Sequence, residues 1–165
     1  MYGFTTSALW AMPVLAVLLG SAASSPVSRA GGADLTGIWI LNVERSSWGR
    51  MKVPASVIVE IEQEGNAIRY TGWVTYANED TREFSFDGAI DGDEYPVTRS
   101  YGPGKLALRQ TDDLTIRTLY TSLDGRYVEN VRMVLSPNHR RMTRYMSLKS
   151  PVGSRQWIEV YERRD

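Results

Sequence analysis

The feature of this sequence that most constrains its fold is a regular succession of turn signals between short segments of alternating apolar and polar residues. From Gly37 onward, clusters of Gly, Asp, Asn and Pro recur about every ten residues, and the segments between them have an apolar period of two. Short strands at this spacing are typical of a β-sandwich or an up-and-down barrel. The signals fall at 64–66, 87–88, 91–92, 102–104, 112–113, 124–125, 137–138 and 151–153.

The segments between the turns predict a single all-β domain over residues 34–165. We expect strands at Gly37–Val43, Ser56–Gln63, Ala67–Tyr76, Thr81–Phe86, Tyr95–Tyr101, Lys105–Gln110, Leu114–Leu123, Arg126–Leu135, Arg141–Leu148 and Gln156–Arg163. No stretch keeps a helical period for three turns, so the only helix we expect is a single turn near Ser46–Met51. The prediction is one antiparallel up-and-down β-barrel of about eight to ten strands with little helix.

The N-terminus reads as a targeting segment. Ala8–Gly20 is an apolar run of 13 residues, whereas a membrane-spanning helix needs about 20. Small residues follow at 21–23, as a signal peptidase requires. We therefore predict a signal peptide over residues 1–23, a flexible leader over 24–33, and a secreted or periplasmic protein. Cleavage after Ala30 and an uncleaved membrane anchor are the alternatives.

Composition excludes several classes of function. Lys plus Arg and Asp plus Glu both number 19, so the net charge is zero and gives no steering field for nucleic acid. The absence of cysteine excludes disulfides, thiol catalysis and thiolate metal sites. His139 is the only histidine, which excludes a metal site built from several histidines. We expect no metal, no cofactor and no stable membrane span after signal cleavage.

The last four strands can be aligned through their turns. Asp124–Gly125 is typical of a two-residue type I′ hairpin turn, which places Leu123 opposite Arg126. A turn over 136–139 then places Leu135 opposite Arg140. A last turn centred on residues 151–152 completes the alignment. A slip of one residue in any turn would exchange the two faces of a strand.

One face of these aligned strands is mostly large and apolar, and we assign it to the interior. It consists of Ile116, Thr118, Tyr120, Glu129, Val131, Met133, Met142, Arg144, Met146, Trp157, Glu159 and Tyr161. Arg144 and Glu159 form a cross-strand pair on it, with Glu129 two rungs away. Such an interior pair contributes little net stability because desolvation offsets the attraction. It indicates either a binding cavity or a small wet core in which Arg144 neutralises Glu159.

The leading hypothesis is the binding of a small, partly hydrophobic molecule inside the barrel. Arg144 and Glu159 would supply the polar anchor, and apolar burial would supply most of the affinity. The remaining residues expected to line the cavity are Ile116, Tyr120, Met133, Met142, Met146, Trp157 and Tyr161.

Short motifs in chain order resemble one known superfamily. Gly37, Ile38 and Trp39 resemble the Gly-x-Trp signature that opens lipocalins and intracellular fatty-acid-binding proteins, together the calycins. Residues 61–68 resemble the early hairpin of the fatty-acid-binding group, residues 83–88 its next strand and turn, and residues 160–163 its chain end. The set is most similar to the lipocalin-like domains of secreted bacterial proteins.

This resemblance implies a barrel that binds a small hydrophobic ligand, with Trp39 closing one end and Arg163 packing on the indole as a cation–π partner. The sequence departs from the fatty-acid-binding pattern twice. The family's Arg-x-Tyr carboxylate clamp has its tyrosine as Tyr161, but Glu159 stands where the arginine would be. Residues 44–55 are also too few for the two-helix lid of that group.

Three alternatives depend on particular residues. His139 lies in a turn and reads as a solvated side chain rather than a catalytic base. Acidic residues gather at Asp87, Asp91, Asp93 and Glu94 without the spacing of a calcium loop, which favours a turn-forming role. A hydrolase or isomerase would depend on Glu159 or Arg144, with Glu129 and Glu159 as a possible glycosidase pair; we expect no enzyme.

The second hypothesis is a protein-interaction or envelope-structural module whose barrel is filled by side chains. Its outer face, with Leu119, Tyr145, Ile158, Arg117 and Arg132, would meet a partner. The volume of the interior distinguishes this hypothesis from ligand binding.

Overall fold

The computed structural model describes residues 32–78 and 80–164, and in these ranges it contains ten strands and no helix. The strands are β1 (Gly37–Leu41), β2 (Ser56–Glu64), β3 (Ala67–Thr75), β4 (Thr81–Ala89), β5 (Glu94–Arg99), β6 (Gly102–Asp112), β7 (Thr115–Ser122), β8 (Val128–Leu135), β9 (Arg141–Ser150) and β10 (Gly153–Arg164). Over the described residues no helix is long and apolar enough to cross a membrane. The predicted signal peptide and most of the predicted leader lie outside these residues.

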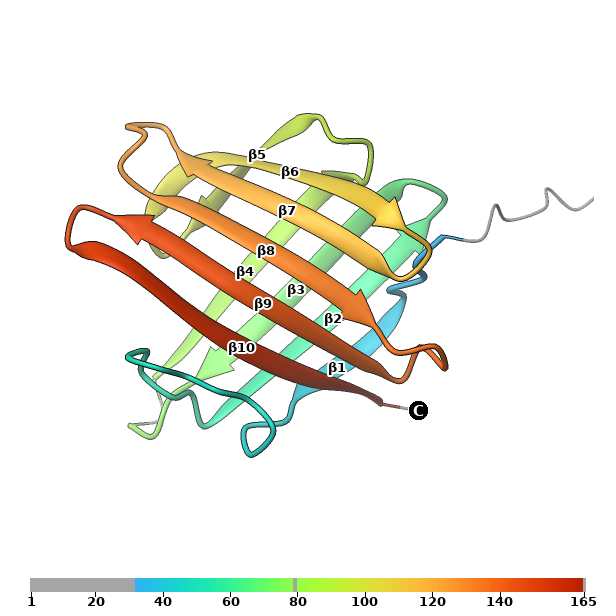
Figure 1. Ribbon diagram of the computed structural model, residues 1–165, viewed down its shortest axis with the longest axis horizontal. Coiled ribbons are helices and arrows are strands. Elements are labelled where there is room, and N and C mark those ends of the chain that lie inside the picture. Colours follow the sequence, from blue (N-terminus) through green and yellow to red (C-terminus); the bar gives the residue numbers. More distant parts are fainter. Residues whose placement is uncertain (1–31, 79, 165) are drawn as a thin grey trace, which may run out of the picture.

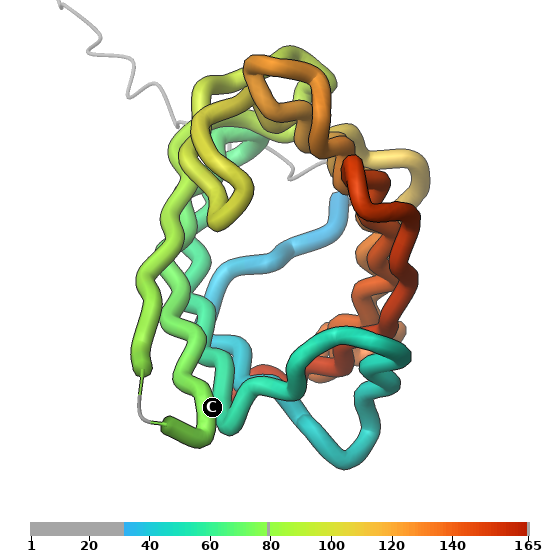
Figure 2. Tube along the Cα trace, turned by 90° about the vertical axis from the view of Figure 1, so that its left-hand side faces the viewer, coloured from blue at the N-terminus to red at the C-terminus, as the bar shows by residue number. Residues whose placement is uncertain are grey.

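All strands belong to one antiparallel sheet in the order β4-β3-β2-β1-β10-β9-β8-β7-β6-β5. The chain pairs each strand with its sequence neighbour, except that β1 pairs with β10 and that β4 and β5 share no ladder. In Figure 1 the strands β6–β10 cross in front of β1–β4, and Figure 2 shows the strands arranged in a ring. The prediction of an up-and-down β-barrel is confirmed, and the barrel is nearly closed.

Side-chain alternation explains why these segments form strands. In β2, Val57, Val59 and Ile61 are buried, while the residues between them are exposed. A period of two places one set of side chains in the barrel and the other in solvent. The same alternation runs through β7 and β9, so the apolar period read from the sequence is the inside–outside pattern of the barrel wall.

Two expected turns are instead parts of strands. Gly88 lies within β4, where a Cβ atom would come 2.6 Å from the Phe86 ring and 2.7 Å from the Tyr95 ring. Gly104 lies within β6, where a Cβ atom would come 2.4 Å from the Thr121 carbonyl oxygen. Both glycines allow close approach of neighbouring groups in a strand. The expectation that 87–88 interrupts a strand was therefore wrong, and the turn expected at 102–104 lies two residues earlier, at 100–101.

The expected helical turn at Ser46–Met51 is absent. The chain there runs along the edge of β10, where the Ser47 and Ile158 backbones exchange two hydrogen bonds of 2.8 Å. The Met51 N–H donates to the Trp48 carbonyl at 2.8 Å, which closes a turn without a helix. Unpaired backbone groups of β10 compete successfully with local helix formation here.

The predicted register is correct for β9 and β10, where Arg144 lies opposite Glu159. Between β8 and β9 it was wrong by two residues, because Leu135 lies opposite Met142. The connecting loop is longer than expected, since the Ser136 N–H bonds to the Arg141 carbonyl. A shift of two residues keeps each side chain on its face, so the assignment of the interior face survives.

The β7–β8 connection also differs in detail. Thr121 lies opposite Val128, in the predicted register. The turn is a four-residue loop over 123–126, closed by a hydrogen bond of 2.8 Å from the Gly125 N–H to the Ser122 carbonyl, rather than a two-residue type I′ turn. Gly125 has φ of 69°, and its freedom at positive φ allows this loop without changing the register.

Trp39 fills one end of the barrel. Its side chain is fully buried, and its indole N–H donates to the Leu35 carbonyl at 2.7 Å. The guanidinium carbon of Arg163 lies 5.5 Å from the Trp39 ring, and Arg163 also donates to the Thr36 carbonyl. Gly37, with φ of 130°, leaves room for Arg163, since a Cβ atom there would lie 2.9 Å from its Nε.

Candidate ligand-binding cavity

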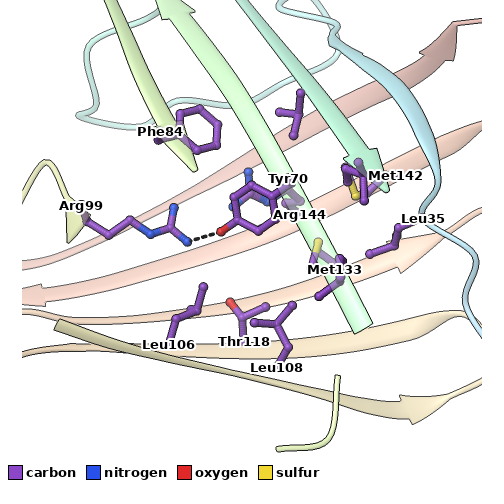
Figure 3. A pocket seen from close by; sticks show the side chains of 13 residues that line it. Leu35, Tyr70, Phe84, Arg99, Leu106, Leu108, Thr118, Met133, Met142 and Arg144 are labelled. Carbon is purple, nitrogen blue, oxygen red and sulfur yellow. Dashed lines mark hydrogen bonds between the residues drawn. The ribbon is translucent and has the colours of Figure 1, made fainter. Parts of the chain in front are cut away.

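The interior contains a small inner space close to the Trp39 end. It leaves about 40 Å³ for the centres of water-sized molecules, so apolar side chains nearly fill it. Its walls are mostly aliphatic and aromatic, and Figure 3 shows these side chains converging from opposite walls of the barrel. They belong to Leu35, Val59, Ile61, Ile68, Tyr70, Phe84, Arg99, Leu106, Leu108, Thr118, Met133, Met142 and Arg144.

A larger outer space lies toward the other end, beside the 48–54 loop. It leaves about 360 Å³ for water-sized molecules, which falls within the size range of small-molecule sites. Phe84, Arg99 and Arg144 line both spaces, so these three side chains mark where the two meet. The barrel is therefore filled at the Trp39 end and hollow at the other.

Charged residues lie at the rim of the outer space. The Lys52 ammonium is 4.4 Å from the centre of the Tyr76 ring, and the guanidinium carbon of Arg82 is 6.0 Å from it. Lys52 and Arg82 are both exposed. Glu83, which is also exposed, lines the same space, so this rim carries two cations and one carboxylate.

The predicted pair of Arg144 and Glu159 forms at the junction of the two spaces. Arg144 donates to a Glu159 carboxylate oxygen at 3.1 Å, and the side chains are only 16% and 13% exposed. Alternation along β10 puts Trp157, Glu159 and Tyr161 on the same inner face. The Trp157 indole N–H and the Tyr161 hydroxyl donate to Glu159 at 2.8 and 3.0 Å. Glu159 therefore accepts from three donors at once.

A second pair of charged residues faces this cluster. Arg99 in β5 donates to the Tyr70 hydroxyl at 2.8 Å (Figure 3). Glu129 in β8 is only 6% exposed. Burying a carboxylate is costly unless nearby positive charges or hydrogen bonds compensate for the lost hydration. Burial raises the pKa of Glu129, while the positive charges of Arg99 and Arg144 act in the opposite direction. Two arginines and two glutamates thus share one half-enclosed site.

The electrostatics of the cluster fix the protonation of its other members. Burial, and next the charge of Glu159, raise the pKa of Tyr161 well above its ordinary value. Burial and Glu129 do the same for the pKa of Tyr101. Burial would lower the pKa of Arg144, but Glu159 and its neighbours raise it. These shifts favour neutral tyrosines and a charged Arg144.

Three N–H groups in this region are buried without a hydrogen-bond acceptor among the described residues. They are the Trp48 Nε1, the Arg99 Nε and the Arg144 Nε. All three residues line the outer space. A buried donor without an acceptor costs about 1–3 kcal/mol, so a water molecule or a ligand that offers acceptors to these donors would be stabilised in the outer space.

The sequence-predicted lining residues divide into three groups. Met133, Met142 and Arg144 line the inner space. Arg144 also lines the outer space, together with Met146, Trp157, Glu159 and Tyr161. Ile116 and Tyr120 point inward but are fully buried in the core and line neither space; the Tyr120 hydroxyl donates to the Gly102 carbonyl at 2.9 Å.

Arg99 lines both spaces but was not among the residues predicted from the sequence. A signal was present, because in the predicted strand Tyr95–Tyr101 the period of two places Tyr95, Val97 and Arg99 on the same face, and Val97 is apolar and buried. Tyr70 and Phe84 were missed because the facing of their strands could not be aligned from the turns. Trp48 lies in the loop between β1 and β2, and its unpaired indole N–H is visible only in the structure.

The acidic residues considered for a metal are separately engaged. Asp87 pairs with Arg69 at 2.7 Å, Glu94 pairs with Lys105 at 2.9 Å, and Asp91 accepts the Tyr95 hydroxyl at 2.7 Å. Within the described ranges, no three acidic or histidine side chains gather into a possible metal site. His139 occupies a turn at φ of 55°, which is the place expected for it.

Comparison with known proteins identifies relatives by fold only. No family model and no curated protein sequence matches the chain. A Schistosoma mansoni fatty acid binding protein in complex with arachidonic acid is similar at a TM-score of 0.55 and 12% identity, covering 84% of this chain and 99% of that one. A secretory abundant heat soluble protein from Ramazzottius varieornatus is similar at 0.56 and 9% identity, covering 81% and 97%.

A third similar structure is a zebrafish ileal bile acid-binding protein complexed with cholic acid. Its TM-score is 0.52 at 12% identity, with 78% of this chain and 98% of that one covered. At such low identities the likeness concerns the backbone, and side-chain roles do not transfer. Together with the ten-stranded topology, it shows that this chain has the same type of β-barrel as these three proteins, which is the type implied by the resemblance of the Gly37–Trp39 motif.

Proposed function

We propose that this protein binds, without catalysis, a small amphipathic molecule whose polar head carries hydrogen-bond acceptors. The observation that supports this most directly is the set of three unpaired N–H groups of Trp48, Arg99 and Arg144 around the outer space. The apolar part of the molecule would lie against Met146, Trp157 and the neighbouring rings. Apolar burial would supply affinity, and the donors would fix orientation.

The charge pattern favours an anionic head. Glu159 is already satisfied by Arg144, Trp157 and Tyr161, so its charge is largely compensated. Among the described residues, the hydrogen-bond partner of Arg99 is the neutral Tyr70 hydroxyl, which leaves most of the Arg99 donors for a ligand. Carboxylates suit a guanidinium because both groups are planar and can form two parallel bonds. Two of the similar structures are complexes with arachidonic acid and cholic acid.

The narrow inner space limits the size of the molecule. A long acyl chain would need the inner space to widen, and Met133 and Met142 are the lining residues that could rearrange at least cost, since methionine side chains are flexible. We therefore propose a compact ligand, seated in the outer space, rather than a long extended chain.

The same contacts argue for binding rather than catalysis. A general base needs a free oxygen within reach of substrate, and the Glu159 carboxylate accepts three hydrogen bonds from the protein. We also propose export, on the strength of the apolar run Ala8–Gly20 and the small residues after it. Cell fractionation followed by intact mass tests this: a chain that begins at Ser24 is expected outside the cytoplasm, and a full-length chain confined to the cytoplasm would contradict it.

Ligand binding is tested with dansylglycine, a compact fluorescent carboxylic acid, and its methyl ester as a neutral control. We expect the acid to bind more tightly than the ester, and Arg99→Gln to weaken the acid about ten- to a hundredfold, the value of hydrogen bonds to a charged group. Trp48→Phe keeps the ring and should cost about fivefold. Arg126→Gln, in an exposed turn away from both spaces, is the matched control. Equal binding of acid and ester, or an unchanged Arg99→Gln variant, would reject the anionic head.

A further inference from the structure

Three arginines lie side by side on the outer surface of the barrel. Arg109 in β6 is directly opposite Arg117 in β7, and Arg117 is directly opposite Arg132 in β8. These three residues, here termed the arginine row, are all exposed. Like charges directly opposite each other in a sheet are destabilising. A row of three therefore has a cost that the fold itself does not explain.

No carboxylate of the described residues pairs with the arginine row. On β7, β8 and β9 the neighbouring rungs of the same face carry only neutral side chains: Leu119, Asn130 and Ser147 on one side, and Thr115, Val134 and Thr143 on the other. At the border of the face, Asp91 accepts the Tyr95 hydroxyl at 2.7 Å and Asp112 accepts the Leu114 N–H at 3.0 Å.

Exposed apolar groups accompany the row. Leu119 and Tyr145 are 42% and 40% exposed. The guanidinium carbon of Arg132 lies 4.1 Å from the centre of the Tyr145 ring, which holds that cation over the surface. A shallow hollow of about 480 Å³ runs between these side chains. A cationic surface interleaved with leucine and tyrosine suits a partner that offers both phosphate and apolar groups.

The opposite outer wall has the reverse charge. There Glu62 and Asp87 flank Arg69, which pairs with Asp87 at 2.7 Å, and Glu60 and Glu83 are also exposed. The zero net charge of the chain thus conceals a cationic wall over β6–β9 and an acidic wall over β2–β4. Such an arrangement orients the molecule in an electric field even without net charge.

We propose that the outer face of β6–β9 docks on an anionic lipid bilayer, with the arginine row holding the phosphates of its headgroups. Guanidinium groups match phosphate geometry. Neighbouring strands are about 4.8 Å apart, so the row with Tyr145 on β9 spans about 15 Å. One small anion cannot neutralise a row of that length, whereas a plane of headgroups can. In Figure 1 the four strands lie next to one another across the front of the barrel, and they present the row over a broad surface.

This docking goes beyond ligand binding and can be tested without a ligand. The assay is co-sedimentation with phosphatidylcholine vesicles that contain or lack phosphatidylglycerol, at low and high salt. The chain should bind only the anionic vesicles and should dissociate in high salt, because exposed charges are screened. The triple variant Arg109→Gln, Arg117→Gln and Arg132→Gln should lose about a hundredfold in partitioning, at about fivefold per arginine.

A matched triple variant removes the same charge elsewhere. Arg45, Arg69 and Arg126 are exposed and each pairs with a carboxylate, so their change to Gln should leave vesicle binding intact. Equal losses in the two triple variants, or binding to neutral vesicles, would overturn the proposal.

Titration with inorganic pyrophosphate and light scattering at low salt complete the test. Tight pyrophosphate binding without vesicle binding would assign the arginine row to a free anion. Salt-sensitive oligomers without vesicle binding would assign it to the acidic wall of a second copy. Either result would reject docking on a bilayer.

Discussion

The pair of Arg144 and Glu159 gives the sharpest test of how the interior is stabilised. Arg144→Met removes the cation but leaves Glu159 nearly buried, with only the Trp157 and Tyr161 donors. At 3.1 Å and an effective dielectric constant of 20, the lost attraction is about 5 kcal/mol before desolvation is counted. Breaking a buried pair costs about 3–5 kcal/mol. Because this pair borders a space open to water, we expect the lower end, about 3 kcal/mol.

The double variant Arg144→Met with Glu159→Leu separates the two contributions. It removes both charges and their desolvation cost together, so its free energy of unfolding should return to within about 1 kcal/mol of the original chain. Urea unfolding followed by tryptophan fluorescence measures both variants. If the double variant is as unstable as the single one, or if the single variant loses nothing, the account of Glu159 as a carboxylate held by compensation is wrong.

Three further variants test other parts of the structure. Burial raises the pKa of Glu129 in the folded state above 4.5. As pH rises, the unfolded chain therefore releases this proton at a lower pH than the folded chain, and the free energy of unfolding should fall from pH 4.5 up to the folded pKa. Urea midpoints across this range should decrease in the original chain and stay level in Glu129→Gln. Gly104→Ala would place a Cβ atom 2.4 Å from a backbone oxygen and should cost about 1–3 kcal/mol, so an unchanged urea midpoint would contradict the close approach of β6 and β7. Arg163→Gln should lower the free energy of unfolding by about 1–2 kcal/mol, because it removes the contact with Trp39 and the hydrogen bonds to two carbonyl groups. A thermal unfolding midpoint that does not fall would show that these contacts are not stabilising.

The barrel could be predicted from the sequence because the apolar period of each strand and the turns between neighbouring strands are properties of short segments of the chain. The period of two along β7 to β10 and the turns between them fixed which side chains face inward, even where one loop was two residues longer than expected. Glycine was a less reliable sign of where a strand ends than the apolar period was of which side chains face inward. Gly88 and Gly104 are needed because rings and backbone come close to them inside strands, and this reason depends on tertiary contacts that composition does not reveal.

The candidate site could be predicted only in part, and the reason lies in the topology. Arg144 and Glu159 meet across a hydrogen-bonded ladder, so the turn between β9 and β10 was enough to pair them. Tyr70 and Arg99 meet across the gap between β4 and β5, where no ladder and no turn carries a register. A contact of this kind depends on how the sheet closes on itself, which no local pattern specifies.

Strand β10 shows how one short segment serves both ends of the barrel. Its inward side chains run from Trp157 through Glu159 and Tyr161 to Arg163. The first three form the polar cluster beside the outer space, and the last covers Trp39 at the filled end. The strand ladder keeps these positions fixed relative to one another. Because three protein donors satisfy Glu159, the donors that have no acceptor among the described residues lie on Arg144 and on two other segments, at Trp48 and Arg99.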